Sequence, residues 1–409
     1  RLILADPRGL EGPFALVERA LVWLLGPTPF AVLLPSAVLG SLTVWLIYLV
    51  TAAVFTDETP ARARSLGLLA ALLAATSAWH VSLSRSGVQV VTLPLLTCLS
   101  LYLLILALRV PQSVRPATAS TIRRHVRRGR FAAACAVPDH AERKRVVVFA
   151  ASGACAGLAS DLAAGLWVLP VLAVAALVFV RWRRPGWYVK SRTGLTVLAS
   201  AAVLAGLPGA WQYYLSRYVG FAPGHGALAK STQGALSFHL RDVLGYFAQV
   251  GRNIGSVAHV LIAQDYSAGG PGVGGAPIIP AIITPVFFVG IVLIVWRWRR
   301  FSSIVVLLLL ALPFIASVSG GPQASVIEAA SALPAICIIP ALALYELALW
   351  FGRLPIALDR AHGVRVFATP ERIGRLLLMV FLLISAMRTF YWYFQATLPV
   401  TPPNTIIAT

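Results

Sequence analysis

The chain has 409 residues, of which 58% are hydrophobic and only 12% charged, and its mean hydropathy is +0.81. Soluble domains carry about 25% charged residues, so the composition excludes an ordinary soluble protein. The net charge of +20 would suit nucleic-acid binding, but basic residues gathered in short loops between apolar segments are better explained by membrane topology. The four cysteines are too dispersed to predict a disulfide framework or a zinc site.

The first predicted element is a helix over residues 12–26, "GPFALVERALVWLLG". This segment is too short and too charged to cross a bilayer. Its apolar residues recur at helical spacing, and Glu18 and Arg19 lie on the other side. We therefore expect it to lie along the membrane surface.

Apolar segments follow, several of them about 20 residues long, which is the length that crosses roughly 30 Å of hydrocarbon. We predict ten spans, at 30–55, 66–83, 88–108, 146–160, 163–180, 193–215, 277–296, 302–318, 328–350 and 375–395. The expected fold class is therefore an all-α polytopic integral membrane protein with about ten transmembrane helices.

The arginines predict the orientation of these spans. Alternate loops hold 25 of the 34 basic residues, including "ARAR" (61–64), "RWRR" (297–300) and the stretch from Arg109 to Arg145. By the positive-inside rule these loops face the cytoplasm, and the protein is expected in the plasma membrane. The opposite, extracytoplasmic side then holds residues 1–29, the tip at 84–87, the tip near Asp161, the loop 216–276, the segment around 319–327 and the C-terminus.

This topology gives the predicted organisation of the chain. The expected divisions are 1–29 (part of a first external loop with the surface helix), 30–215 (transmembrane helices with a basic cytoplasmic loop at 109–145), 216–276 (external loop), 277–395 (transmembrane helices) and 396–409 (external tail). With both ends outside and no signal peptide, we expect a missing span before Arg1 and a C-terminus that is also cut.

Candidate chemistry lies on the predicted external side. The sequence contains no phosphate-binding glycine loop, G-x-S-x-G elbow or H-E-x-x-H motif. Instead, acidic residues gather at this face together with Arg85, which sits between two apolar runs in "WHVSLSRSGVQVV" (79–91). Carboxylates there can act as a base or hold a metal or sugar hydroxyls, whereas solvated loops would carry the same residues. Arg85 itself either snorkels to the headgroups or binds a substrate.

Several segments resemble bacterial membrane glycosyltransferases of the GT-C fold, of the dolichyl-phosphate-mannose protein mannosyltransferase type (glycosyltransferase family 39). "LEGPFALVERALVWLLGPTPFAVLLPSAVLGSLTVWLIYLV" (10–50) is similar to their first external loop and second span. "AALLAATSAWHVSLSRSGVQVVTLPLLTCLSLYLL" (70–104) resembles the next two spans with a Ser-Arg tip. "GACAGLASDLAAGLWVLPVLAVAALVF" (153–179) and "AQDYSAGGPGVGGAPIIPAIITPVFFVGIVLIVWRWRR" (263–300) resemble later segments.

The resemblance implies transfer of a mannose-like sugar from a polyprenyl-phosphate donor, outside the cytoplasm, to a protein, lipid or glycan acceptor. It implies that Asp6 or Glu11 acts as base or orients the acceptor, although the family's main catalytic Asp follows the absent first span. Arg85 is the expected phosphate ligand, because its planar fork can donate two parallel hydrogen bonds. His80, Asp265 and Asp161 complete the expected substrate side, and a divalent cation is a candidate cofactor.

Structural explanations exist for the same residues. Glu11 suits the start of a helix, near the positive end of its dipole, and His80 suits a satisfied interfacial position. Asp161 stands where the family often has an aromatic residue. The competing functions are a transporter or flippase of a lipid-linked substrate and a non-catalytic GT-C paralogue. A transporter would carry polar or ionisable groups near the midplane, often in broken helices.

Overall fold

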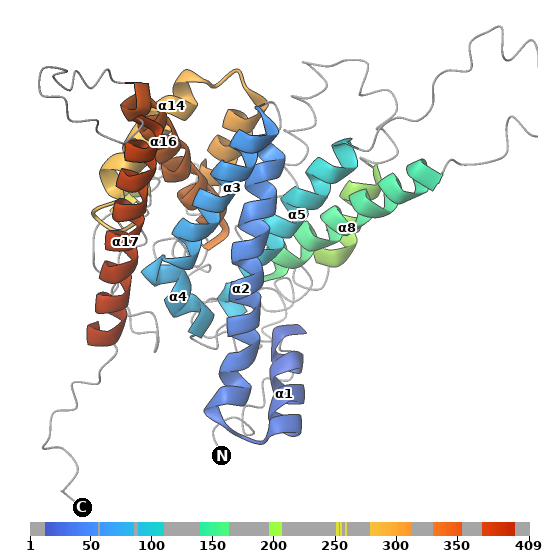
Figure 1. Ribbon diagram of the computed structural model, residues 1–409. Helices are drawn as coiled ribbons and strands as arrows, with labels where there is room; N and C mark the ends of the chain where they lie inside the picture. The colour runs from blue at the N-terminus through green and yellow to red at the C-terminus, as the bar shows by residue number, and fades with distance from the viewer. Residues whose placement is uncertain are drawn as a thin grey trace, which may run out of the picture.

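The computed structural model describes residues 13–55, 58–85, 89–109, 140–162, 196–206, 279–311, 330–353 and 370–396, with short pieces at 251–252, 254–255 and 258–259. These residues form helices and no strand, which confirms the predicted all-α class. In Figure 1 some of the helices run roughly parallel to one another, and others cross them obliquely.

The first two helices form a hairpin. α1 (Pro13–Leu25) confirms the helix predicted for 12–26, and α2 (Pro29–Val54) covers the first predicted span. Gly26 lies between them with a φ of 79°, a left-handed conformation that favours glycine. Thr28 then accepts a hydrogen bond from the Ala31 N–H at 3.2 Å, so the next helix begins with a side-chain cap. α1 packs beside the lower part of α2 (Figure 1), and its placement along a membrane surface stays a prediction.

Helices of the described residues fall in every predicted span except 163–180, which lies outside them. The remaining elements are α3 (Pro60–Ala75), α4 (Ala78–Arg85), η1 (Gln89–Val91), α5 (Thr92–Arg109), α8 (His140–Leu162), the helix Thr196–Gly206, α14 (Thr284–Trp296), the helix Phe301–Ala311, α16 (Leu333–Arg353) and α17 (Pro370–Ala396). α8 starts at His140, so its first turns include the last basic residues of the stretch 109–145, whose cytoplasmic placement stays a prediction.

Not all of these helices are long enough to cross a bilayer. Within the described residues, α2 and the segment Leu333–Trp350 of α16 have the length and apolar composition of a span. α3 and α4 together form a third candidate, which bends by 61° at the break between them. The other apolar helices are shorter, so the structure supports a membrane protein while the count of ten spans stays a prediction.

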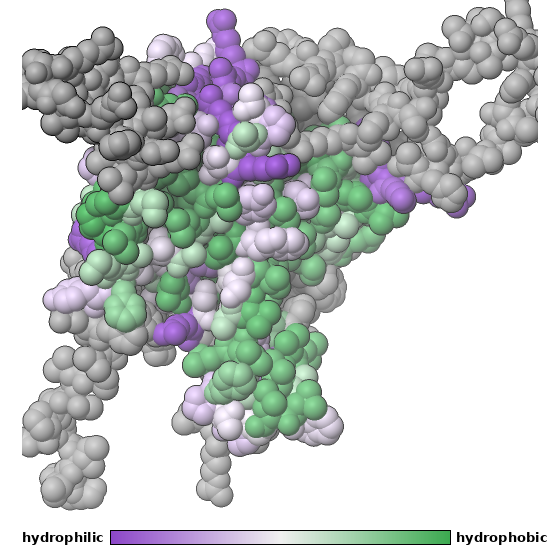
Figure 2. Space-filling view, in the orientation of Figure 1, coloured by the Kyte–Doolittle hydropathy of each residue, from purple (hydrophilic) through white to green (hydrophobic). Residues whose placement is uncertain are grey.

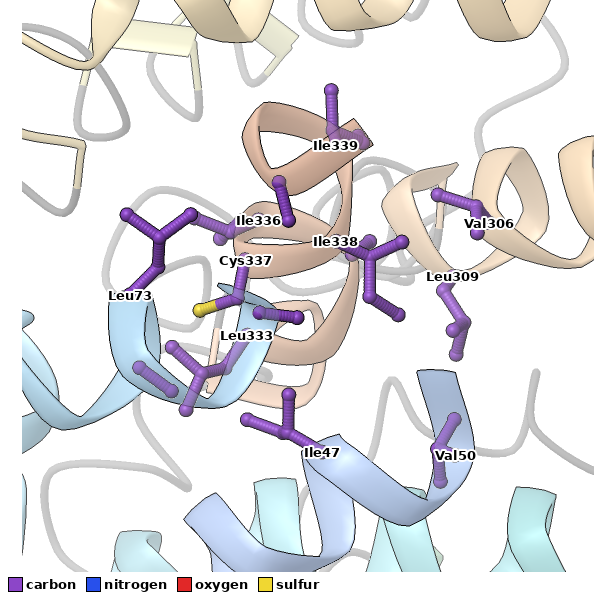
Figure 3. Close-up of a cluster of buried hydrophobic side chains, with 14 of the residues drawn as sticks. Ile47, Val50, Leu73, Val306, Leu309, Leu333, Ile336, Cys337, Ile338 and Ile339 are labelled. Carbon is purple, nitrogen blue, oxygen red and sulfur yellow. The ribbon is translucent and has the colours of Figure 1, made fainter. Parts of the chain in front are cut away.

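α16 lies at the centre of the largest hydrophobic cluster. Its residues from Leu333 to Leu344 are buried throughout, as a helix surrounded by other helices requires. Figure 3 shows side chains from α2 (Ile47 and Val50), α3 (Leu73) and the helix Phe301–Ala311 (Val306 and Leu309) converging on it. At Gly290 of α14 an added Cβ would lie 2.4 Å from the Ile339 carbonyl, so only glycine permits this approach.

A second helix packing site joins α5, α8 and the helix Thr196–Gly206. Ser100 on α5 and Ser152 on α8 donate reciprocal hydrogen bonds to each other's backbone carbonyls, at 3.0 and 2.8 Å. Gly153 and Gly157 follow on α8, where an added Cβ would lie 2.2 and 2.4 Å from backbone oxygens of the neighbouring helix. This close approach is typical of helices that associate in lipid.

The surface is consistent with a lipid environment. Large hydrophobic side chains are exposed along the helices, for example Trp23 at 84%, Val292 at 65% and Met387 at 64%. Figure 2 shows hydrophobic residues over α1 and the lower part of α2, whereas hydrophilic residues gather at the upper end, where α2 ends and α3 begins. Apolar patches of this extent mark a surface that water does not cover.

Candidate functional site

The candidate site is built on the break between α3 and α4. The sequence encodes this break locally: Thr76 ends α3, and its side chain donates to the Leu72 carbonyl at 2.9 Å. Ser77 follows and accepts a hydrogen bond from the His80 N–H at 3.4 Å, as a helix N-cap does. No proline is involved in the break. The eight-residue α4 therefore starts a new axis at this point.

α17 closes the break from the side. The Thr389 hydroxyl of α17 donates to the Thr76 carbonyl, a group that the interrupted helix leaves without its usual partner. Ser385, one turn away on the same helix, is also buried, and its hydroxyl has no hydrogen-bond partner among the described residues. α17 thus brings a polar side chain, that of Thr389, to the point where regular hydrogen bonding is interrupted.

His80 is the most buried polar residue of α4. Its side chain is only 2% exposed, between α4 and α2, and its Nε2 lies 3.1 Å from the Gly40 carbonyl. Because a carbonyl only accepts hydrogen bonds, Nε2 carries the proton and donates. The other ring nitrogen, Nδ1, has no partner among the described residues, and neither does the buried hydroxyl of Ser36, one turn before Gly40.

Gly40 lets α4 approach α2 closely. A Cβ built at this position would lie 2.0 Å from the Ser84 Oγ and 2.6 Å from its Cβ, distances that side chains do not tolerate. The Ser84 hydroxyl is itself held, because it donates to the His80 carbonyl at 2.8 Å. Two contacts between α2 and α4, His80 with Gly40 and Ser84 with Gly40, therefore fix the position of α4.

Arg85 ends α4 and is exposed. Residues 86–88 lie outside the described residues and include the rest of the predicted tip (84–87), and η1 and α5 follow them. A basic residue in the last turn also suits the negative end of the helix dipole. His80 and Arg85 are five residues apart, so their side chains leave different faces of α4. The structure brings these two predicted residues onto one short helix, one buried and one exposed.

The other predicted site residues are described only in part. Asp6, Glu11 and Asp265 lie outside the described residues. Asp161 lies in the last turn of α8, and its side chain is outside the described set. Their assembly around Arg85 therefore stays a prediction. Within the described part of the chain, no group of three or more His, Cys, Asp and Glu side chains could hold a metal ion.

Sequence reasoning missed an ion-pair network at the opposite end of α3. Glu346 of α16 accepts hydrogen bonds from Arg62 and from Arg297, the latter at 2.7 Å. Glu58 forms ion pairs with Arg62 at 3.3 Å and with Arg300. Two arginine clusters predicted to share the cytoplasmic side thus meet at one end of the molecule. The arginines were assigned to topology alone. Glu58, four residues before Arg62, was a local signal for part of the network, whereas Glu346 is 284 residues from Arg62.

Comparison with known proteins gives a match of the fold but no match of the sequence. No family model and no curated protein matches the sequence. The fold is similar to that of the archaeal oligosaccharyltransferase AglB from Archaeoglobus fulgidus in complex with an inhibitory peptide and a dolichol-phosphate, with a TM-score of 0.50 and 16% sequence identity. The match covers 92% of this chain and 47% of that chain.

Two further structures of an Archaeoglobus fulgidus oligosaccharyltransferase give similar values at 16% identity. The one tethered with an acceptor peptide has a TM-score of 0.49, and the apo form has 0.48. The chain thus spans about half the length of the structures that it resembles. The first of these comparisons shows a likeness of fold: the helices are arranged similarly to those of that archaeal oligosaccharyltransferase.

Proposed function

We propose that this protein is a membrane glycosyltransferase that takes a mannose-like sugar from a polyprenyl-phosphate donor on the extracytoplasmic face. The observation that carries the proposal is the likeness of its fold to an archaeal oligosaccharyltransferase over 92% of the chain, which supports a GT-C arrangement. A solved relative of this arrangement holds a dolichol-phosphate, the same chemical class as the proposed donor. The exposed Arg85, at the end of a short helix held against α2, is a group suited to a phosphate.

The reaction requires few groups. An acceptor hydroxyl attacks C1 of the sugar, the bond from C1 to the phosphate oxygen breaks, and polyprenyl phosphate leaves with the electron pair. A carboxylate, for which Asp6 and Glu11 are the candidates, takes the hydroxyl proton or orients the acceptor. Arg85 donates hydrogen bonds to the phosphate as negative charge develops on the leaving oxygen. Asp161 and Asp265 are candidates for contacts with the hydroxyls of the sugar.

Arg85→Ala tests this proposal. The protein would be placed in nanodiscs with polyprenyl-phosphate-mannose and a Ser/Thr-rich acceptor peptide, and release of polyprenyl phosphate would be measured against donor concentration. We expect the KM for the donor to rise about tenfold or more, the effect of losing a charge-assisted hydrogen bond. Arg85→Lys keeps the charge but not the planar fork, so its KM should lie in between.

Arg64→Ala is the matched control, since Arg64 is an exposed arginine at the other end of the same bent helix pair. Its KM should equal that of the wild type. If Arg85→Ala retained the full rate at limiting donor, Arg85 would not bind the phosphate. If the wild type released no polyprenyl phosphate while remaining folded, the transferase proposal would be wrong.

A specific observation also favours the transporter. The α3–α4 pair is a broken helix with a buried histidine directly after the break, which is a combination found at transporter binding sites. The two functions differ in bond chemistry. A transporter or flippase would move polyprenyl-phosphate-mannose between the leaflets of a vesicle without cleaving it, whereas the transferase releases polyprenyl phosphate. Mass spectrometry of the lipid after incubation separates these results.

A further inference from the structure

We propose that His80 is a positioning residue: through the Gly40 carbonyl it fixes α4 against α2 and so determines where Arg85 meets the phosphate. This inference rests on the proposed function for the role of Arg85. It assigns His80 a different task from direct substrate contact, because a side chain that is 2% exposed and already donates to a backbone carbonyl is not available to a donor in the lipid.

The protonation state of His80 follows from its surroundings. Nε2 carries a proton because its partner is the Gly40 carbonyl oxygen. A second proton on Nδ1 would create a buried cation, and among the described residues Nδ1 has no partner that could compensate for it. The neutral imidazole therefore serves as a hydrogen-bond donor of fixed direction. The role needs only the N–H at the Nε2 position, and no titration of the ring.

α4 depends on such contacts because it is short and discontinuous with α3. Its first end is held at the break, where Thr389 of α17 bonds to the Thr76 carbonyl. The bond from His80 to Gly40 holds its middle, and Arg85 follows about 7.5 Å further along the axis at a rise of 1.5 Å per residue. A change of tilt at the middle would displace Arg85, and a displacement of about 1 Å can reduce a rate 10²-fold.

Gly40 supports the same arrangement by steric means. Any side chain at this position would meet the Ser84 Oγ and Cβ, and would push α4 away from α2. The Ser84 Cα lies 3.5 Å from the built Cβ, an ordinary contact distance, so loss of the Ser84 side chain would make room for one methyl group. A substitution of Ser84 by glycine should therefore compensate for a substitution of Gly40 by alanine.

The first test measures binding of polyprenyl phosphate, without a sugar, to the protein in nanodiscs by native mass spectrometry. We expect His80→Leu to weaken binding about tenfold, as Arg85→Ala does, because α4 loses its bond to α2. His80→Gln should bind within about twofold of the wild type, since the glutamine amide can donate from nearly the same place as Nε2. In the transfer assay His80→Gln should also keep the wild-type pH profile.

The second test uses Gly40→Ala, which should weaken binding as His80→Leu does. The double variant Gly40→Ala with Ser84→Gly should restore most of the affinity, because the clashing atoms are removed. This pair keeps the inference testable if His80→Leu fails to fold.

The outcomes separate the inference from the proposed function. If the wild type bound no polyprenyl phosphate, both would be wrong. If the wild type bound it and His80→Gln lost as much affinity as His80→Leu, the imidazole itself would be required and the positioning role would be overturned, while the proposed function stood. Equal binding by His80→Leu and the wild type would overturn the inference in the same way.

Discussion

The two ends of the bent pair α3–α4 hold their arginines in opposite ways. At the start of α3, Arg62 is half-buried between two carboxylates, and it also lies over the Tyr345 ring at 5.3 Å. At the end of α4, Arg85 is exposed. Two buried polar atoms of α4 and α2, the Nδ1 of His80 and the Oγ of Ser36, have no hydrogen-bond partner among the described residues. One end buries its arginine among carboxylates, whereas the arginine at the other end is exposed.

This difference suggests that the Glu58–Glu346 end of the helix pair stabilises the fold and that the α4 end serves the proposed binding site. Charges that are paired inside the protein hold helices together, and removing one partner leaves the other buried without compensation. An exposed arginine on a short helix contributes little to stability. We therefore expect substitutions at the Glu58–Glu346 end to affect unfolding first, and substitutions at the α4 end to affect donor binding first.

The largest expected loss of stability follows Glu346→Ala. This change removes the carboxylate shared by Arg62 and Arg297, whose side chains are 21% and 26% exposed. The free energy of unfolding should fall by about 2–3 kcal/mol, less than the roughly 3–5 kcal/mol of a fully buried pair because solvent reaches all three groups. Unfolding in mixed detergent micelles, followed by tryptophan fluorescence, measures the change.

Glu346→Gln is the control for this prediction, because it keeps the shape and one acceptor oxygen and should lose less. Binding of polyprenyl phosphate by folded Glu346→Ala should match the wild type. A variant that unfolded like the wild type but bound the lipid phosphate more weakly would reverse the proposed division between the two ends.

A smaller loss is expected at the α3–α4 break. Thr389→Val keeps the shape of the side chain but removes the hydroxyl that donates to the Thr76 carbonyl. The free energy of unfolding should fall by about 1 kcal/mol, the usual net contribution of one hydrogen bond. Thr389→Ser retains the hydroxyl and should restore most of the difference in the same unfolding measurement. A Val variant as stable as the wild type would show that another group satisfies the carbonyl.

Much of the fold could be predicted because lipid imposes a simple rule on the sequence. Long apolar runs must become helices, and the helix boundaries follow from signals such as Thr28 before Pro29 and Thr59 before Pro60, which cap α2 and α3. Breaks within a predicted span were harder to predict from the sequence. The predicted span 66–83 is broken at Thr76–Ser77, where the sequence has no proline.

The candidate site was predictable only where one residue type is unusual in its place. Arg85 between apolar runs is such a residue, and its position at the end of α4 agrees with the predicted tip. The contact of His80 with Gly40 spans 40 residues of sequence and depends on how α4 turns after the break, so no local pattern predicts it. The pairing of Glu346 with Arg62, 284 residues apart, was hidden for the same reason.

The smallest expected effect tests the limits of the network. Arg300 pairs with Glu58 from a side chain that is 49% exposed, so its charge is largely screened by water. Arg300→Ala should lower the free energy of unfolding by less than about 1 kcal/mol, and the loss should shrink as salt is added. A double-mutant cycle with Glu58→Gln isolates the pair from the bond between Glu58 and Arg62. A coupling energy as large as the effect of Glu346→Ala would mean that the network acts as one unit out to its exposed edge. A small coupling would place its stabilising centre at Glu346, where α3, α16 and the turn after α14 meet.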